Sequence, residues 1–314
     1  MMSTFSLTIV FLFCVCVFTN SVADATAQSK KPTKKKRWRP STKLPEGVSE
    51  KLGVVYAQYG KRKLELDLFS PTKGKGPWPA IVVVHGGGWL KGDRSRFRAL
   101  AVALAKRGYV TAAISYRLGG EALFPAAIQD CNASVRYLRA NAKKHFLDPS
   151  RIGAVGGSAG GHLVGVMATA PHLKEFQGNG GNADESSALQ SAIVMAGPLE
   201  LATGSVAKRS REQPKKSNSN KWLGKTIDEA PELYKKASPI THVTQKTPPI
   251  LFMAGEFDKP ERNKATRDKL KALGVETGII VVKDGKHGCW NREPWFTPMV
   301  AEMDKFFRRT LRPR

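Results

Sequence analysis

Hydrophobic positions from about residue 50 onward follow two alternating patterns. Short, nearly continuous apolar runs predict strands buried on both faces, at 80–84, 110–115, 152–155, 192–196, 250–254 and 278–282. Apolar residues at helical spacing predict helices at 95–107, 125–144, 162–170, 263–273 and 296–311. Two earlier strands, at 54–58 and 63–69, are joined by a turn at Gly60. The alternation predicts an α/β fold with a mostly parallel sheet and helices on both faces.

No internal repeat or linker interrupts the pattern, so we expect one domain over residues 49–314. One stretch lacks both patterns. Residues 205–221 are polar and show neither a strand-like apolar run nor apolar residues at helical spacing. We interpret them as a loop or a reduced lid, part of a short basic cap insert at about 203–222.

The N-terminus has the layout of a secretory signal peptide. An apolar run at 5–18 precedes small residues, and we place the signal peptide at 1–25. No Lys or Arg precedes the apolar run, so an uncleaved N-terminal anchor stays open as an alternative. No other stretch is long and apolar enough to cross a membrane. A secreted or periplasmic protein is therefore expected, without a stable membrane span after cleavage.

Composition fits a folded chain, but the charge is unusual. The 314 residues are 41% hydrophobic and carry a net charge of +25. Most of the surplus lies in three clusters, at 30–43, 208–225 and 305–314. We expect residues 26–48 to be a basic disordered tail that could dock on an anionic polymer. Nucleic acid is not an expected partner, because the basic tail carries one aromatic residue, Trp38, and an exported protein rarely meets nucleic acid.

Four cysteines are too few for a disulfide scaffold. Cys14 and Cys16 leave with the signal peptide. Cys131 and Cys289 remain, either as a disulfide, which an exported protein permits, or as free thiols.

A nucleophile motif stands at 156–160, where a buried strand meets a predicted helix. Gly156-Gly157-Ser158-Ala159-Gly160 has the G-x-S-x-G form. A sharp strand-to-helix turn lifts a serine hydroxyl above the sheet edge, and Gly156 and Gly160 allow strand and helix to approach closely. On its own the motif could also be a tightly packed glycine turn.

A second glycine run strengthens the interpretation. His85-Gly86-Gly87-Gly88-Trp89 follows the strand at 80–84. The backbone N–H groups of Gly87 and Gly88, with that of Ala159, could form an oxyanion hole. We expect His85 to brace this loop by hydrogen bonds rather than to transfer protons, with Trp89 beside it.

An acid and a base follow at the ends of later strands. Asp258 ends the stretch Gly255-Glu256-Phe257-Asp258, and His287 lies in Gly285-Lys286-His287-Gly288. The order Ser158, Asp258, His287 is that of a catalytic triad on this architecture. The competing acids are Glu256, Glu261 and Asp284.

The remaining histidines rank lower. His162 is expected to pack under the site, and His145, His172 and His242 to be surface or structural residues. No residue spacing indicates a metal site, and no phosphate-binding loop is present, so neither a metal nor a cofactor is expected.

With these motifs in order, residues 50–310 resemble the esterase/lipase branch of the α/β-hydrolases. That branch includes hormone-sensitive-lipase-like carboxylesterases and bacterial acetyl-xylan and feruloyl esterase-like enzymes. The resemblance implies the α/β-hydrolase fold and a serine esterase acting on short-chain or carbohydrate-linked esters. One departure is Asp258-Lys-Pro-Glu-Arg262, where the family often has Val-Pro after the acid. A serine amidase or peptidase of the same fold, and a non-catalytic protein binding an anionic polysaccharide, stay open.

Overall fold

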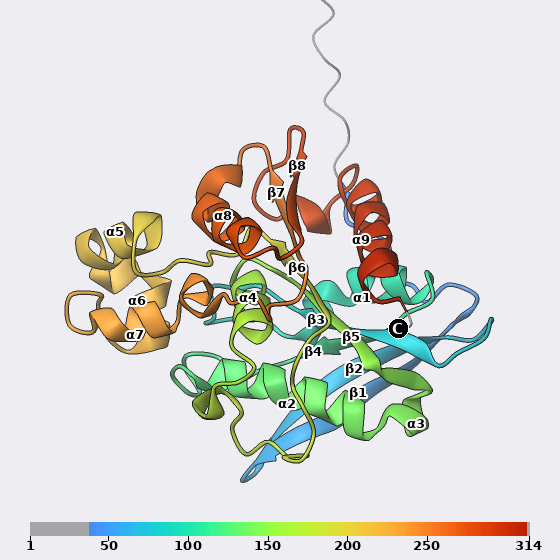
Figure 1. Ribbon diagram of the computed structural model, residues 1–314. Helices are drawn as coiled ribbons and strands as arrows, with labels where there is room; N and C mark the ends of the chain where they lie inside the picture. Colours follow the sequence, from blue (N-terminus) through green and yellow to red (C-terminus); the bar gives the residue numbers. More distant parts are fainter. Residues whose placement is uncertain (1–37, 313–314) are drawn as a thin grey trace, which may run out of the picture. The chain divides into compact units, whose positions relative to one another are not determined.

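Eight strands form one sheet in the computed structural model, which describes residues 38–312 (Figure 1). Their spatial order is β1-β2-β4-β3-β5-β6-β7-β8. β1 pairs with β2 and β2 with β4 in antiparallel fashion, and all other neighbours are parallel. The strands are β1 Val48–Tyr59, β2 Arg62–Pro71, β3 Trp78–Val84, β4 Val110–Ile114, β5 Leu147–Gly157, β6 Ser191–Met195, β7 Ile250–Gly255 and β8 Thr277–Val282.

Helices cover both faces of this sheet. α2 and α4 pack on one face and α1 and α9 on the other. The helices are α1 Arg98–Ala105, α2 Ala126–Ala140, α3 Ala142–His145, α4 Ala159–Thr169, α5 Gly204–Glu212, α6 Asn218–Leu223, α7 Pro231–Lys236, α8 Lys264–Ala272 and α9 Phe296–Thr310. This confirms the predicted mostly parallel sheet with helices on both faces.

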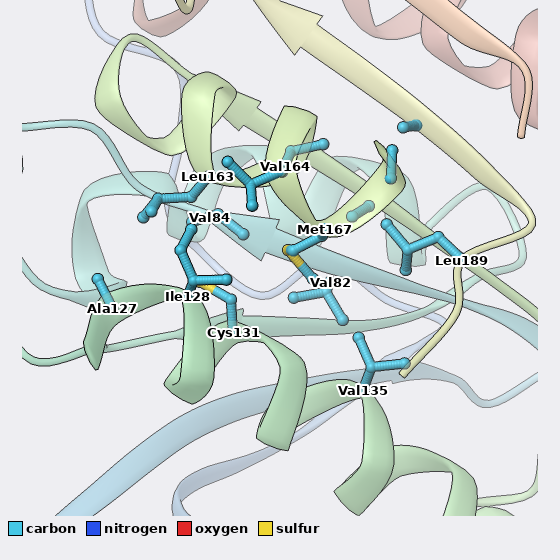
Figure 2. Packing of buried hydrophobic residues seen from close by; sticks show 14 of the residues in the cluster. Val82, Val84, Ala127, Ile128, Cys131, Val135, Leu163, Val164, Met167 and Leu189 are labelled. Carbon is cyan, nitrogen blue, oxygen red and sulfur yellow. The ribbon is translucent and has the colours of Figure 1, made fainter. Parts of the chain in front are cut away.

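The strand β3 shows why the apolar runs are continuous. Val82 and Val84 belong to the cluster under α2 and α4, and Ile81 and Val83 belong to the cluster under α9. Because a strand alternates its side chains between faces, a strand covered on both sides is apolar throughout. Figure 2 shows the first cluster, where side chains of α2, β3 and α4 meet.

The same separation of faces settles the cysteine alternatives. Cys131 lies in the cluster under α2, and Cys289 lies in the cluster on the opposite face. Both are buried free thiols. The possible Cys131–Cys289 disulfide is therefore wrong, because the sheet stands between the two residues.

Most predicted elements are confirmed, with shifts at their ends. β1, β2 and β5 are longer than predicted, and the helix predicted at 125–144 is divided at Asn141 into α2 and α3. The helix predicted from His162 starts at Ala159, directly after the candidate nucleophile.

The predicted loop at 205–221 is instead mostly helical. It contains α5, the start of α6 and a short 3-10 turn, and with α7 it forms a group to one side of the sheet (Figure 1). Helical spacing of apolar residues does not reveal α5, because this helix buries only two small residues, Ala207 and Ser210. Ser217 precedes α6 as its N-cap, and its side chain accepts a hydrogen bond from the Asn220 N–H.

Residues 38–47 correct part of the predicted disordered tail. They contain no helix or strand, yet they contact the domain: the carbonyl of Trp38 accepts from the Glu293 N–H, and that of Thr42 accepts from Arg98. β1 then starts at Val48, inside the predicted tail. The predicted signal peptide at 1–25 and residues 26–37 of the predicted tail lie outside the described residues. In the described part, no helix is long and apolar enough to span a membrane.

Phe307 of α9 provides a test of the sheet–helix core. Its ring is fully buried, so Phe307→Ala should lower the free energy of unfolding by about 3–5 kcal/mol through lost burial and a residual cavity. Phe257→Ala is the matched control, because that ring is 63% exposed and should change stability by less than about 0.5 kcal/mol. Urea unfolding followed by fluorescence measures both. Equal effects would contradict the assigned core.

Candidate active site

Ser158 occupies a strained turn between β5 and α4. Its backbone angles are φ 56° and ψ −122°, a region that residues with a side chain rarely adopt. The turn is held from both sides: the Ser158 N–H donates to Met195 O at 2.8 Å, and its carbonyl accepts from the His162 N–H at 3.0 Å. The hydroxyl is thereby presented at the carboxyl edge of the sheet.

Two glycines make this turn possible by their lack of a side chain. A Cβ at Gly156 would collide with the carbonyl of Gly160, and a Cβ at Gly160 would collide with the carbonyls of Val84 and His85. Backbone atoms cannot move aside as a flexible side chain can. The approach of α4 to β3 and β5 therefore requires glycine at both positions.

Ser158, His287 and Asp258 form a hydrogen-bonded chain. His287 Nε2 lies 3.0 Å from Ser158 Oγ, and His287 Nδ1 lies 2.6 Å from Asp258 Oδ2. Asp258 is buried, whereas the His287 side chain is 51% exposed. With Nδ1–H donating to Asp258, Nε2 is free to accept the serine proton.

Two of the three rival acids make other contacts. Glu256 accepts a hydrogen bond from the Asp284 N–H, and Glu261 pairs with Arg267 at 3.0 Å. Asp258 is the carboxylate that the structure places on His287. Arg262 belongs to the sequence after Asp258 that departs from the family pattern. Its Nη1 donates to Ala196 O at 3.0 Å, and its Nη2 lies 3.6 Å from Asp258 Oδ1.

The glycine loop after β3 lies directly against the nucleophile turn. A Cβ at Gly86 would stand 2.6 Å from Gly157 O and 3.2 Å from the Ser158 Cβ. Among the described residues, no hydrogen bond is donated by the N–H groups of Gly87, Gly88 or Ala159. Ala159 is also the first residue of α4, where a helix favours negative charge. These groups are available to an oxyanion.

His85 sits behind this loop, where it is 1% exposed. Its Nδ1–H donates to Gly86 O at 2.8 Å, and its ring stacks on Tyr116 at 4.3 Å. Tyr116 in turn donates to His85 O at 2.9 Å. Burial lowers the pKa of His85 to about 4, so it is neutral at pH 7. These contacts fit the predicted role of His85, which is to hold the glycine loop in place by hydrogen bonds.

Trp89 and His162 join the loop to α4 and the cap. Trp89 Nε1–H donates to His162 Nδ1 at 3.2 Å, and His162 Nε2–H donates to Ala237 O at 2.7 Å. Burial lowers the pKa of His162 to about 4. Trp222 of α6 stacks on Trp89 at 5.1 Å, and a Cβ at Gly88 would collide with the Asn218 side chain. The cap helix α6 therefore rests on the glycine loop.

A cavity of about 350 Å³ opens beside Ser158. Its walls come from the glycine loop, the segment after β6, the cap helices and the loop after β7. Three cations, Arg209, Lys259 and Arg262, line it, and no carboxylate does. An adjoining cavity of about 260 Å³ shares Lys259 and Arg262 and adds Glu200.

Sequence reasoning missed several of these residues. Arg209 was hidden inside a segment interpreted as a loop, and Trp222 carries no motif. Arg262 could have been singled out, because the departure after Asp258 was visible in the sequence. Within residues 38–312, no group of three or more His, Cys, Asp or Glu is arranged to hold a metal ion.

Comparison with known proteins places this geometry in a family context. Residues 66–269 match the model of the BD-FAE family. Among curated proteins, esterase LipC of Mycobacterium tuberculosis is 28% identical over 69% of this chain and 54% of its own length. Isoprenylcysteine alpha-carbonyl methylesterase ICME of Arabidopsis thaliana is 23% identical over 74% of this chain and 55% of its own. The chain spans about half the length of the curated relatives it matches.

Two solved structures match over nearly their full length. A truncated carbohydrate esterase from gut microbiota superposes with a TM-score of 0.75 at 26% identity, over 87% of this chain and 99% of that one. Esterase Est2 of Thermogutta terrifontis with bound propionate gives 0.69 at 26%, over 86% and 98%. These neighbours show that the fold is that of α/β-hydrolase esterases.

The two buried neutral histidines predict an acid-sensitive fold. An unfolded histidine titrates near pH 6.5, so between about pH 6.5 and 4 the unfolded chain binds protons that folded His85 and His162 do not. The free energy of unfolding is therefore not reduced by these two histidines above pH 6.5. It falls as the pH is lowered from 6.5 toward 4, by up to about 3 kcal/mol for each histidine.

Urea unfolding at several pH values from 7.5 to 4.5 measures this slope. His162→Gln keeps an acceptor for Trp89 and a donor for Ala237 O, and should make the slope shallower. His172→Gln makes the same substitution at an exposed position and is the comparison variant. An unaltered slope in His162→Gln would contradict the assignment.

Proposed function

The chain belongs to the BD-FAE family of α/β-hydrolase esterases, and from that premise we propose that it is an exported serine esterase acting on short-chain or carbohydrate-linked carboxylic esters. The observation that carries the proposal is the hydrogen-bonded chain from Ser158 Oγ through His287 to the buried Asp258. Ser158 lies on a strained turn whose neighbours offer free backbone N–H groups. Each part has a defined role in acyl transfer.

In the first half-reaction, Ser158 Oγ attacks the ester carbonyl while its proton passes to His287 Nε2. The imidazolium that forms is stabilised by the buried Asp258 carboxylate, which also fixes Nδ1–H in place. The carbonyl oxygen becomes an oxyanion facing the N–H groups of Gly87, Gly88 and Ala159. One such donor is worth on the order of 3 kcal/mol in the transition state.

Collapse of the tetrahedral intermediate breaks the bond to the alcohol, which takes the proton from His287. Water then enters, loses a proton to His287 Nε2 and attacks the acyl-enzyme. The carboxylic acid leaves, and Ser158 regains its proton.

The two sides of the site differ in openness. The alcohol must leave on the side of His287, which is half exposed, so a large alcohol such as a carbohydrate has room there. His287 does not line the cavity of about 350 Å³, which we assign to the acyl group. A cavity near the small end of ligand pockets suits a short acyl chain.

Substitution of the triad tests the reaction. Ser158→Ala and His287→Ala should each lower kcat for 4-nitrophenyl butyrate by about 10⁴-fold or more, and Asp258→Asn by about 10⁴-fold, because the residues act as a unit. Glu256→Gln is the matched control: its amide oxygen can still accept from the Asp284 N–H, and kcat should be unchanged.

The outcome separates the open alternatives. Turnover of the matched 4-nitroanilide at a rate comparable to the ester would favour an amidase. Equal inactivity of wild type and Ser158→Ala toward all acyl lengths would overturn the esterase proposal and favour a binding protein.

Export and the basic tail form a separate proposal, supported by the sequence of residues 1–48. Expression of the full chain should give an extracytoplasmic protein whose intact mass lacks about the first 25 residues. Its retention on a carboxylated polysaccharide resin should fall when residues 28–43 are deleted, since these carry the densest positive charge. An uncleaved mass would indicate an N-terminal anchor, and unchanged retention would exclude docking by the tail.

A further inference from the structure

We propose that the acyl group carries a negative charge, so that the substrates are half-esters of dicarboxylic acids whose free carboxylate meets Arg209 and Lys259. This inference rests on the proposed esterase function and goes beyond it by naming the acyl class. It starts from the three cations that line the cavity beside Ser158 without a lining carboxylate. Like charges gathered around one cavity repel each other, and an anionic ligand would relieve that repulsion.

Arg209 lacks the partners that its neighbours have. On the same helix α5, Lys208 pairs with Glu212 at 3.7 Å and Arg211 pairs with Asp228 at 2.8 Å. In the described part of the chain, the Arg209 side chain makes no hydrogen bond and no ion pair, and it lines the cavity. Of the three cations on α5, two are therefore paired with carboxylates and the third, Arg209, lines the cavity.

Lys259 lines the same cavity from the loop after β7, directly after the proposed triad acid. Its φ of 51° lies in the left-handed region, where a lysine is strained and glycine or asparagine would be cheaper. The Lys259 side chain has no ion-pair partner within residues 38–312. A charged side chain kept at a strained position in a substrate cavity is a functional signal.

Arg262 completes the set but is partly engaged. It binds Ala196 O and lies near Asp258, and its Nε atom is buried without a hydrogen-bond partner among the described residues. Because it contacts the triad acid, its substitution would mix binding with catalysis. Arg209 and Lys259 therefore carry the test. Glu200 lines only the adjoining cavity.

The charge belongs to the acyl side because His287, which protonates the leaving alcohol, does not line this cavity. Arginine and lysine together suit a carboxylate, which accepts several hydrogen bonds at once. The carbonyl would lie at Ser158, with the free carboxylate deeper in the cavity toward the cap.

Three substrates separate the possibilities. The 4-nitrophenyl half-ester of adipic acid carries a negative charge on its acyl group. 4-Nitrophenyl hexanoate is the neutral ester of equal chain length. The ester of hexanoic acid with 3-carboxy-4-nitrophenol carries its negative charge on the alcohol instead. For the wild type we expect kcat/KM to be higher for the adipate half-ester than for the hexanoate. We expect this ratio to fall as salt is raised.

Substitutions then locate the effect. Arg209→Met and Lys259→Met should each lower the adipate-to-hexanoate ratio by about 3-fold, and the double variant by about 10-fold, as expected for partly exposed charge pairs. Arg209→Lys should restore most of the ratio. Lys208→Met is the matched control: it removes one charge from the same helix but not from the cavity, and the ratio should not move.

Each variant serves as its own reference, because the measured quantity is the ratio of its kcat/KM values for two esters. A wild type that hydrolyses hexanoate but shows no preference for the adipate half-ester overturns the inference and leaves the esterase function standing. A shift confined to the ester with the charged alcohol would also overturn it. Inactivity toward all three esters would count against the proposed function itself. Thermal unfolding of every variant confirms that ratios come from folded protein.

Discussion

The close contact between the nucleophile turn and the end of β3 is the constraint on which the site depends. Gly160 of α4 lies against the carbonyls of Val84 and His85, with no space for a methyl group. This contact brings two segments, more than 70 residues apart in sequence, within reach of one carbonyl carbon. The strained φ of Ser158 is tolerated because backbone hydrogen bonds from β6 and α4 hold the turn.

The proposed acid and base are positioned by the same sheet. Parallel strands end at one edge, so Asp258 after β7 and His287 after β8 reach Ser158 after β5 without any long loop. Arg262 ties Asp258 to the end of β6, which neighbours the nucleophile strand. The order of strands in space, rather than in sequence, is what makes the three side chains meet.

The elements that could be predicted from the sequence are those with a strong local pattern of residues. Continuous apolar runs located β3, β4, β6 and β7, because strands buried on both faces leave no other pattern. Glycine-rich turns located the nucleophile and the loop after β3. The cap insert was predicted from its polar, basic composition, but its helices were not, since α5 buries only an alanine and a serine. The helix signal of α6 is a polar N-cap, Ser217. The contacts of Arg209, Lys259 and Trp222 depend on tertiary packing, which no local pattern encodes.

The stacking of Trp222 on Trp89 bears on how substrate enters. A true lid must swing away without disturbing the catalytic groups, but α6 shares this aromatic contact with the glycine loop and presses Asn218 over Gly88. Displacing it would break the contacts that α6 makes with the glycine loop. Asn218 and Ser219 of α6 also line the cavity beside Ser158, so α6 forms part of its wall. For the proposed esterase, this contact predicts simple hyperbolic kinetics on dissolved esters, with no lag phase and no burst of activity at a lipid–water interface.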